Sequence, residues 1–212
     1  MGRIPDRLHH GSLEKMSKLK KYNEKRDFRQ TSEPSGGSES TENGALFVIQ
    51  EHAASTHHFD FRLQVDGVLR SWAVPKGPST DPSEKRLAIA TEDHPLDYAD
   101  FEGVIPEDEY GGGEVIVWDQ GTYEHLTEKD GEPITFEEAE KKGHIAVRLD
   151  GEKIAGGYDL IKMKGKKWSS DHWLLKKRDD DEADARRKPT STEPESVLSG
   201  KTVDDLKEEA SS

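Results

Sequence analysis

Residues 58–74 read HFDFRLQVDGVLRSWAV, and this stretch predicts a β-hairpin. Apolar and polar residues alternate through its first half, as in a strand with one buried face. Asp66-Gly67 then gives the two-residue signal of a tight hairpin turn, because both residue types tolerate the positive φ that such a turn requires. We therefore expect strands over 58–65 and 68–74, joined by a short turn.

The two faces of the first strand differ in chemistry. Successive side chains of a strand point to opposite faces, so Phe59 and Phe61 would face a core. His58, Asp60 and Arg62 lie in a row on the other face. An imidazole, a carboxylate and a guanidinium are costly to bury side by side unless they engage something. The hairpin therefore predicts a site as well as a fold.

The strand-and-turn pattern continues along the chain, with short apolar runs from Ala45 onward that are broken by Gly, Pro and Asp. We expect strands at 45–52, 58–65, 68–74, 85–92, 114–119, 122–126, 144–149, 156–164 and 172–178. Asp150-Gly151 is a second hairpin signal. Many short strands without βαβ alternation indicate an all-β barrel or sandwich.

One short helix is expected over 135–142. Thr135 would be its N-cap, and Glu138 follows three residues later, which is the spacing of a capping box. Gly143 would end the helix, because glycine adopts the left-handed conformation of a helix C-cap.

Composition indicates a small core with polar ends. Hydrophobic residues make up 31% of the 212 residues and charged residues 35%, which is polar for a globular domain. We expect an N-terminal arm and flexible linker over 1–43, a β-barrel domain over 44–179, and a charged, disordered tail over 180–212. A helical turn is expected within that tail, around 203–209.

The chain contains no cysteine, which excludes disulfides and thiolate zinc sites. It has no apolar run near 18 residues, and its first 21 residues lack the apolar segment of a secretory signal. A cytoplasmic location is therefore expected.

The net charge of −13 differs from the basic footprint of most nucleic-acid-binding proteins. The charge is nevertheless segregated along the chain. Residues 92–140 hold seventeen acidic residues and one basic, whereas residues 153–178 hold eight basic residues and two acidic. This distribution is compatible with a local basic surface, and equally with a solvated lysine-rich hairpin.

His52 extends the polar row of the hairpin into a candidate metal site. It ends the strand before His58, and the short connection between them would bring the two histidines together. With Asp60, they would offer two imidazoles and one carboxylate, a set that suits a divalent metal. Such a triad leaves coordination positions for water and substrate. Arg62 beside it suits an anion, because its planar fork can bind two oxygens.

Three further residues indicate that phosphate could bind beside the candidate metal site. Glu92 and His94 share a face of another strand end, where the histidine could contact a phosphoryl oxygen or protonate a leaving group. Lys76 lies between two prolines that restrain its backbone, and it could direct its ammonium at an anion.

These residues lie in motifs that resemble the 3′-phosphoesterase domain of the bacterial and archaeal DNA ligase D family. The motifs are FVIQEH (47–52), HFDFRL (58–63), DGVLRSWAVPKGP (66–78), EDHPLDY (92–98), FEGVIP (101–106), EYGGG (109–113) and WLLKK (173–177). Upstream, YNEKRDFRQTSEP (22–34) looks like the family's N-terminal arm. The resemblance covers about residues 20–180, with the motifs in the same order.

The resemblance implies a compact β-barrel and a metal ion, Mn²⁺ above all, with Co²⁺ or Zn²⁺ as alternatives. The implied metal ligands are His52, His58 and Asp60, and the implied phosphate ligands are Arg62, His94 and Lys76. Glu92 and Tyr98 would line the site with Lys76, and Asp93 would support it. From the arm, Arg26, Asp27 and Glu33 would fold back and assist the diesterase step.

The family removes a 3′-terminal ribonucleotide from a primer-template and then the 3′-phosphate that remains, leaving a 3′-hydroxyl for repair and ligation. Because ligase and polymerase modules are absent from this sequence, we expect a stand-alone monomer that works alone or with such partners in trans. His57 departs from the family pattern, which more often has an apolar residue there. Strand alternation favours His58 as the metal ligand, since only His58 shares a face with Asp60.

Two other functions remain compatible with the residues. A non-heme iron oxygenase also uses two histidines and a carboxylate, which here would be His58, Asp60 and His94. A non-catalytic nucleic-acid adaptor would instead use the basic region 153–178 as its docking surface.

Overall fold

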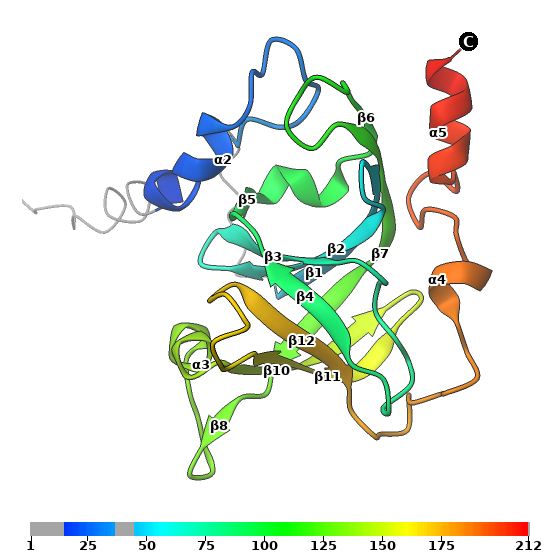
Figure 1. Ribbon diagram of the computed structural model, residues 1–212. Coiled ribbons are helices and arrows are strands. Elements are labelled where there is room, and N and C mark those ends of the chain that lie inside the picture. Colours follow the sequence, from blue (N-terminus) through cyan, green and yellow to red (C-terminus); the bar gives the residue numbers. More distant parts are fainter. Residues whose placement is uncertain (1–14, 37–44, 212) are drawn as a thin grey trace, which may run out of the picture.

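The strands close into a barrel because the first strand pairs with two others. In the computed structural model, which describes residues 15–36 and 45–211, eight strands pair in a continuous antiparallel ring (Figure 1). In order of pairing, the strands are β1 (Leu46–Ala54), β2 (His58–Val65), β3 (Val68–Val74), β4 (Arg86–Ala90), β12 (His172–Lys177), β11 (Ala155–Lys162), β10 (His144–Gly151) and β7 (Gly113–His125), which returns to β1. The expected all-β barrel is confirmed.

Short elements surround this ring. They are α2 (Lys20–Glu24), β5 (His94–Pro95), the 3-10 helix η1 (Leu96–Asp100), β6 (Gly103–Ile105), β8 (Glu128–Lys129), β9 (Glu132–Pro133), α3 (Phe136–Lys142), α4 (Pro189–Thr192) and α5 (Val203–Ala210). The helix expected over 135–142 is α3, with the Thr135–Glu138 capping box in place and Gly143 at a φ of 79°. Across the residues that the structure describes, no helix has both the length and the apolar character to span a membrane.

The predicted strands agree with the observed ones to within two residues at most ends, except in β7. The sequence predicts two strands there, at 114–119 and 122–126, whereas the structure has one strand of 13 residues. Gly121 lies within it because β10 passes very close: a Cβ at that position would lie 2.0 Å from the carbonyl oxygen of Asp150. This glycine therefore permits close pairing and does not mark a turn.

The two Asp-Gly signals behave differently. Asp66 and Gly67 have φ values of 49° and 78°, so they form the predicted turn between β2 and β3. Asp150 and Gly151 remain in β10, and the chain reverses one step later, at residues 152–154. There the buried Asp119 carboxylate accepts hydrogen bonds from three successive backbone N–H groups, which fixes the turn.

Two apolar layers enclose the polar face of the hairpin. The barrel interior is filled by large side chains such as Phe59, Phe61 and Trp118. A second cluster, which includes Tyr22, Tyr98, Phe101, Leu69 and Val48, covers the outer face of β1 and β3. Figure 1 shows α2, β5 and β6 on this side of the barrel. Polar residues of β1 and β2 that point outward are thus buried beneath this second cluster and the segments that carry it, which together we call the cap.

The C-terminal tail differs from the expectation of disorder. Residues 180–211 pack along the barrel and include α4 and α5, the second of which covers the helical turn expected around 203–209 (Figure 1). Trp118 Nε1 and Lys153 Nζ donate to the carbonyl oxygen of Glu193 at 2.8 and 2.7 Å, and Val197 N donates to Val117 O at 3.0 Å. Composition predicted disorder because the tail has few apolar residues, but barrel side chains satisfy its backbone instead.

The N-terminal expectation is tested only in part. Residues 15–36 are described, and their helix and loop pack against the cap through the fully buried Tyr22, whose hydroxyl donates to the carbonyl of Pro34 at 2.7 Å. The rest of the expected arm and linker, together with the boundary at residue 44, falls in residues 1–14 and 37–44, which lie outside the described residues.

Removal of residues 180–212 is expected to lower the free energy of unfolding by at least about 2 kcal/mol, because each lost hydrogen bond contributes about 0.5–1.5 kcal/mol. Urea denaturation of the truncated and full chains measures the difference. Equal midpoints and slopes would show that the tail adds no stability, as expected of a disordered segment.

Candidate active site

The outward face of the β1–β2 hairpin forms the floor of a cavity. In the register of the two strands, His52 lies opposite His58 and Gln50 opposite Asp60. Because alternate residues share a face, these four side chains point the same way. The cavity has a volume of about 280 Å³ and lies between the hairpin and the cap. Its lining includes eight predicted site residues: Arg26, His52, His58, Asp60, Arg62, Glu92, His94 and Tyr98.

Three of these side chains bring possible ligand atoms together. One atom from each of His52, His58 and Asp60 lies within 4.8 Å of the other two, and no other such group occurs among residues 15–36 and 45–211. His52 Nδ1 is 3.8 Å from Asp60 Oδ2, and His58 Nε2 is 3.6 Å from the same oxygen. Strand pairing thus assembles the predicted triad.

The backbone fixes the tautomer of both histidines. His52 Nε2 lies 2.8 Å from the carbonyl oxygen of Gly111, and His58 Nδ1 lies 2.7 Å from that of Thr56. A carbonyl oxygen only accepts, so both ring nitrogens must carry the proton. The opposite nitrogens, His52 Nδ1 and His58 Nε2, are the two that face Asp60. Each has a lone pair available, which is how metal-binding histidines are held.

His57 has a different environment from its neighbour. Its Nε2 lies 2.7 Å from Glu51 Oε1, and its ring meets the edge of Phe59 at 5.5 Å, away from Asp60. The preference for His58, derived from strand alternation, agrees with this geometry. Two imidazole nitrogens and one carboxylate oxygen fit a divalent metal ion, and the donors leave further coordination positions to substrate or water.

Arg62 is held in place along its whole guanidinium. Its Nε donates to Gln50 Oε1 at 2.8 Å, one terminal nitrogen to Ser71 Oγ at 2.8 Å, and the other to Asp60 Oδ2 at 3.0 Å. Gln50 is oriented in turn, because its amide nitrogen donates to the carbonyls of Tyr98 and Phe101. An arginine has five N–H groups, so two remain for a ligand in the cavity.

The charge of Asp60 follows from these neighbours. Burial alone would raise the pKa of this carboxyl, but the positive charge of Arg62, with the hydrogen bonds that the two imidazoles donate when they are protonated, holds the pKa well below its usual range. Asp60 therefore carries a full negative charge, which balances Arg62 and favours a cation between the histidines.

His94 is neutral in the structure. Burial lowers the pKa of its imidazole well below the usual value, and the positive charges of Arg62 and Arg26 lower it further. Its Nδ1 donates to the carbonyl of Glu92 at 2.9 Å, and an Arg26 nitrogen lies 3.4 Å from its Nε2. Arginine only donates, so Nε2 carries the lone pair.

The N-terminal segment closes the cavity from above. Arg26 donates to Glu33 at 2.8 Å and to Glu92 at 3.3 Å, with its guanidinium 3.8 Å above the ring of Tyr22. Glu33 also accepts from the hydroxyl of Tyr98 at 3.0 Å. Burial would raise the pKa of Glu92, but its own backbone N–H, Lys25 and Arg26 together lower it. The segment therefore adds one guanidinium to the lining.

Comparison with known proteins assigns the chain to a family. Residues 50–162 match the family model described as the DNA ligase D 3′-phosphoesterase domain. The chain belongs to that family and is a phosphoesterase.

Curated relatives of the phosphoesterase are much longer proteins. It is 48% identical over 191 residues to "Multifunctional non-homologous end joining protein LigD" of Pseudomonas aeruginosa, covering 87% of this chain and 22% of that protein. It is 47% identical over 163 residues to "Multifunctional non-homologous end joining DNA repair protein LigD" of Mycobacterium tuberculosis, covering 76% of this chain and 20% of that protein. The phosphoesterase thus spans about a fifth of the length of these relatives.

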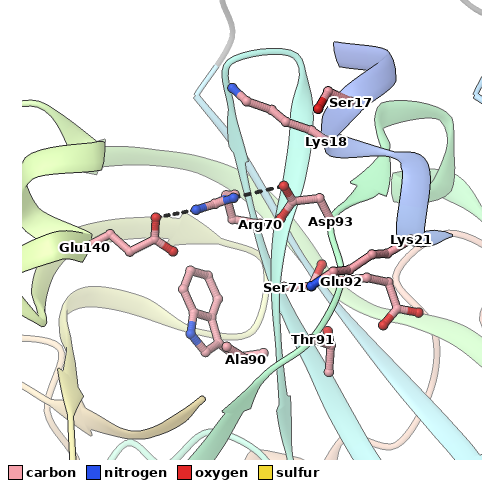
Figure 2. Close-up of a pocket in the computed structure, with 11 residues that line it drawn as sticks. Ser17, Lys18, Lys21, Arg70, Ser71, Ala90, Thr91, Glu92, Asp93 and Glu140 are labelled. Carbon is pink, nitrogen blue, oxygen red and sulfur yellow. Dashed lines mark hydrogen bonds and ion pairs between the residues drawn. The ribbon is translucent and has the colours of Figure 1, made fainter. Parts of the chain in front are cut away.

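Four predicted residues lie outside the cavity lining. Glu33 is one of them, but it contacts two lining residues, Arg26 and Tyr98. The other three make no such contact among the described residues. Lys76 is exposed in the turn after β3, which ends with Val74 opposite Phe59, and Lys76 is not part of the cavity lining. Asp27 is paired with Arg29 and Gln30. Asp93 faces a neighbouring cavity, where it accepts from Arg70 at 2.9 Å (Figure 2). The structure therefore does not bring these three to the histidines.

Other polar residues of the phosphoesterase site were missed by the sequence analysis. Gln50 and Ser71 orient Arg62, while Lys25 donates to Glu92 and to the Tyr110 hydroxyl, both at 3.0 Å. Gln50 had a usable signal, because it shares the strand face of His52 within an otherwise apolar run. The others depend on contacts between distant segments.

The oxygenase alternative requires a different triad. It needs His94 beside His58 and Asp60, whereas the lone pair of His94 Nε2 faces Arg26 and the second imidazole of the group belongs to His52. The geometry therefore favours the phosphoesterase arrangement.

The buried neutral His94 predicts a pH-dependent stability. Its folded pKa is depressed, so the unfolded chain binds a proton more readily and folding loses stability as the pH falls below about 6.5. For the metal-free protein between pH 7.5 and 5.5, the loss attributable to His94 should reach up to about 1.4 kcal/mol per pH unit. Urea denaturation should show a smaller loss in His94→Asn, whose amide can keep the bond to Glu92. Parallel pH curves for the two proteins would contradict this.

Proposed function

We propose that the phosphoesterase trims the 3′ ends of nucleic acid, removing a terminal ribonucleotide and then the remaining 3′-phosphate to leave a 3′-hydroxyl. One observation carries this proposal. The ligand nitrogens of His52 and His58 lie together with the Asp60 carboxylate in a cavity that Arg62 and Arg26 also line. One cation site beside two fixed arginines suits a phosphate ester.

We further propose that His52 Nδ1, His58 Nε2 and a carboxylate oxygen of Asp60 hold Mn²⁺, with Co²⁺ or Zn²⁺ as substitutes. Such an ion would neutralise a phosphoryl oxygen and acidify a bound water. Arg62, held by Gln50, Ser71 and Asp60, would bind the equatorial oxygens without needing to reorganise.

His94 would begin the reaction neutral. Its unprotonated Nε2, which faces Arg26, could exchange that contact for a hydrogen bond from the substrate or from water, and it lies beside the two arginines that would bind the phosphate. When a phosphate dianion binds, its negative charge favours the protonated imidazole, which can then donate to the leaving oxygen. His94 is thus suited to act after binding.

The N-terminal segment that closes the cavity suits the first of the two steps, removal of the terminal ribonucleotide. A diester places a second nucleoside beyond the phosphate, so it extends farther from the metal triad than a terminal phosphate does. Arg26, which lines the cavity and is positioned by Glu33 and Glu92, would contact that part of the substrate. A terminal 2′-hydroxyl would distinguish ribonucleotide from deoxyribonucleotide. Lys76 and Asp27 would then contribute only if substrate reaches beyond the cavity.

The relatives are named for non-homologous end joining, which supports a role of the phosphoesterase in processing ends for that pathway. A clean 3′-hydroxyl is what a ligase or polymerase requires, so we propose that such enzymes use the ends that the phosphoesterase produces. Action as a monomer, with those enzymes in trans, remains our expectation.

The proposal is tested with a labelled DNA primer that ends in one ribonucleotide and is annealed to a longer template. With Mn²⁺, the wild type should release the terminal nucleoside and then the phosphate, and a chelator should stop both steps. His58→Ala should lower the rate at least about 100-fold, because even residues behind a metal ligand contribute 10- to 100-fold.

His57→Ala is the matched control, since it removes the adjacent imidazole, which faces Glu51. It should keep wild-type trimming. Absence of trimming by the folded wild type with any divalent metal would refute the proposed function, and equal losses in the two variants would refute the assignment of His58.

A further inference from the structure

The loop between β11 and β12 exposes an aromatic ring among lysines. This Trp168 loop comprises residues 163–171, and Trp168 is 43% exposed. The other three tryptophans, Trp72, Trp118 and Trp173, are no more than 2% exposed. A large indole in water is costly, so an exposed one surrounded by charge is a candidate contact for a partner.

The lysines of this loop have no partner in the protein. Within the described part of the chain, no salt bridge or side-chain hydrogen bond involves Lys164, Lys166 or Lys167. Other basic residues of the same segment serve the fold: Lys153 holds the C-terminal tail, and Lys177 is buried against Asp180. The expected basic surface is therefore confined to the tip of one loop.

The loop lies beside the catalytic cavity. Its last residue, Asp171, accepts a hydrogen bond from Ala90 N at 2.7 Å, at the end of β4. Thr91, which follows Ala90, lines both the catalytic cavity and the adjoining cavity of about 320 Å³ in Figure 2. Lys18 and Lys21 line that adjoining cavity. Trp168 comes three positions before Asp171, a span of at most about 10 Å.

The base of the loop is ordered by its own contacts. Trp168 N donates to Gly165 O at 3.2 Å, and Gly165 has a φ of 120°, which L side chains rarely adopt. The indole lies 5.7 Å from the ring of His172, the first residue of β12. The indole thus contacts the first residue of the strand with its ring tilted by 48°, and much of the indole stays open to solvent.

We propose that the Trp168 loop binds the unpaired template strand next to the primer terminus, with a template base stacked on Trp168 and its phosphates near Lys164, Lys166 and Lys167. This inference rests on the proposed function, because the primer end would occupy the catalytic cavity. Duplex bases have no free face for stacking, whereas overhanging bases do.

Tryptophan fluorescence tests the stacking directly. The three other tryptophans are shielded, so iodide quenching should report mainly on Trp168. A primer-template with a 5′ overhang of the template, added in chelator to prevent turnover, should quench emission and protect Trp168 from iodide. A blunt duplex of the same length should do so far less. Quenching of equal size with both DNAs, or none with either, would overturn stacking on the overhang.

Binding measurements test the energetic contribution. In chelator, Trp168→Ala should weaken binding of the overhang substrate at least about fivefold more than binding of the blunt duplex. K166Q/K167Q should reduce the slope of log affinity against log salt by about 1.4 for the overhang substrate. K85Q/K129Q, with the same change of charge, is the control, because Lys85 precedes the opposite end of β4 and Lys129 lies in β8.

Two outcomes separate this inference from the proposed function. If the wild type trims the ribonucleotide while all variants bind the overhang equally well, the loop has no role and the function stands. If the wild type neither trims nor binds any primer-template, the proposed function fails and the inference fails with it.

Discussion

The buried carboxylate of Asp60 is the constraint on which the site depends. It lies between two apolar layers, where a charge survives only if its neighbours compensate it. Arg62 does so directly, whereas the lone pairs that the neutral histidines direct at the same oxygen call for a cation between them. Removal of either charge of the Arg62–Asp60 pair would leave the other uncompensated, which is strongly destabilising for a buried pair. Part of the fold's stability is thus tied to an arrangement suited to a cation and an anion.

Strand geometry explains how such a site arises from a short sequence. The β1–β2 register places His52 opposite His58, and alternation adds Asp60 and Arg62 to the same face. The cap supplies what the hairpin lacks: backbone carbonyls that orient Gln50, and Arg26 from a segment far away in sequence. The hairpin determines which residues meet, and the cap determines their charge and solvent access.

Sequence patterns therefore predicted some parts of the molecule well. Period-two alternation and the Asp66-Gly67 turn were sufficient for β2, β3 and the choice of His58 over His57. The neutral state of His94 was not predictable, because it depends on burial and on Arg26 from the distant arm. The ordered tail escaped prediction for a related reason: Trp118 and Lys153 of the barrel satisfy its carbonyls. Lys76 lies outside the cavity lining, because proximity in sequence to β3 does not by itself give proximity to the histidines.

The central claim is that the lone pairs of His52 and His58 converge with Asp60 to bind one metal ion. A crystal structure of the Mn²⁺-soaked protein, with diffraction measured at the manganese absorption edge, tests it most directly. The account predicts one anomalous peak bonded to His52 Nδ1, His58 Nε2 and an oxygen of Asp60. A peak bonded to His57, or to the opposite nitrogen of either histidine, would contradict it, as would the absence of any peak at the triad.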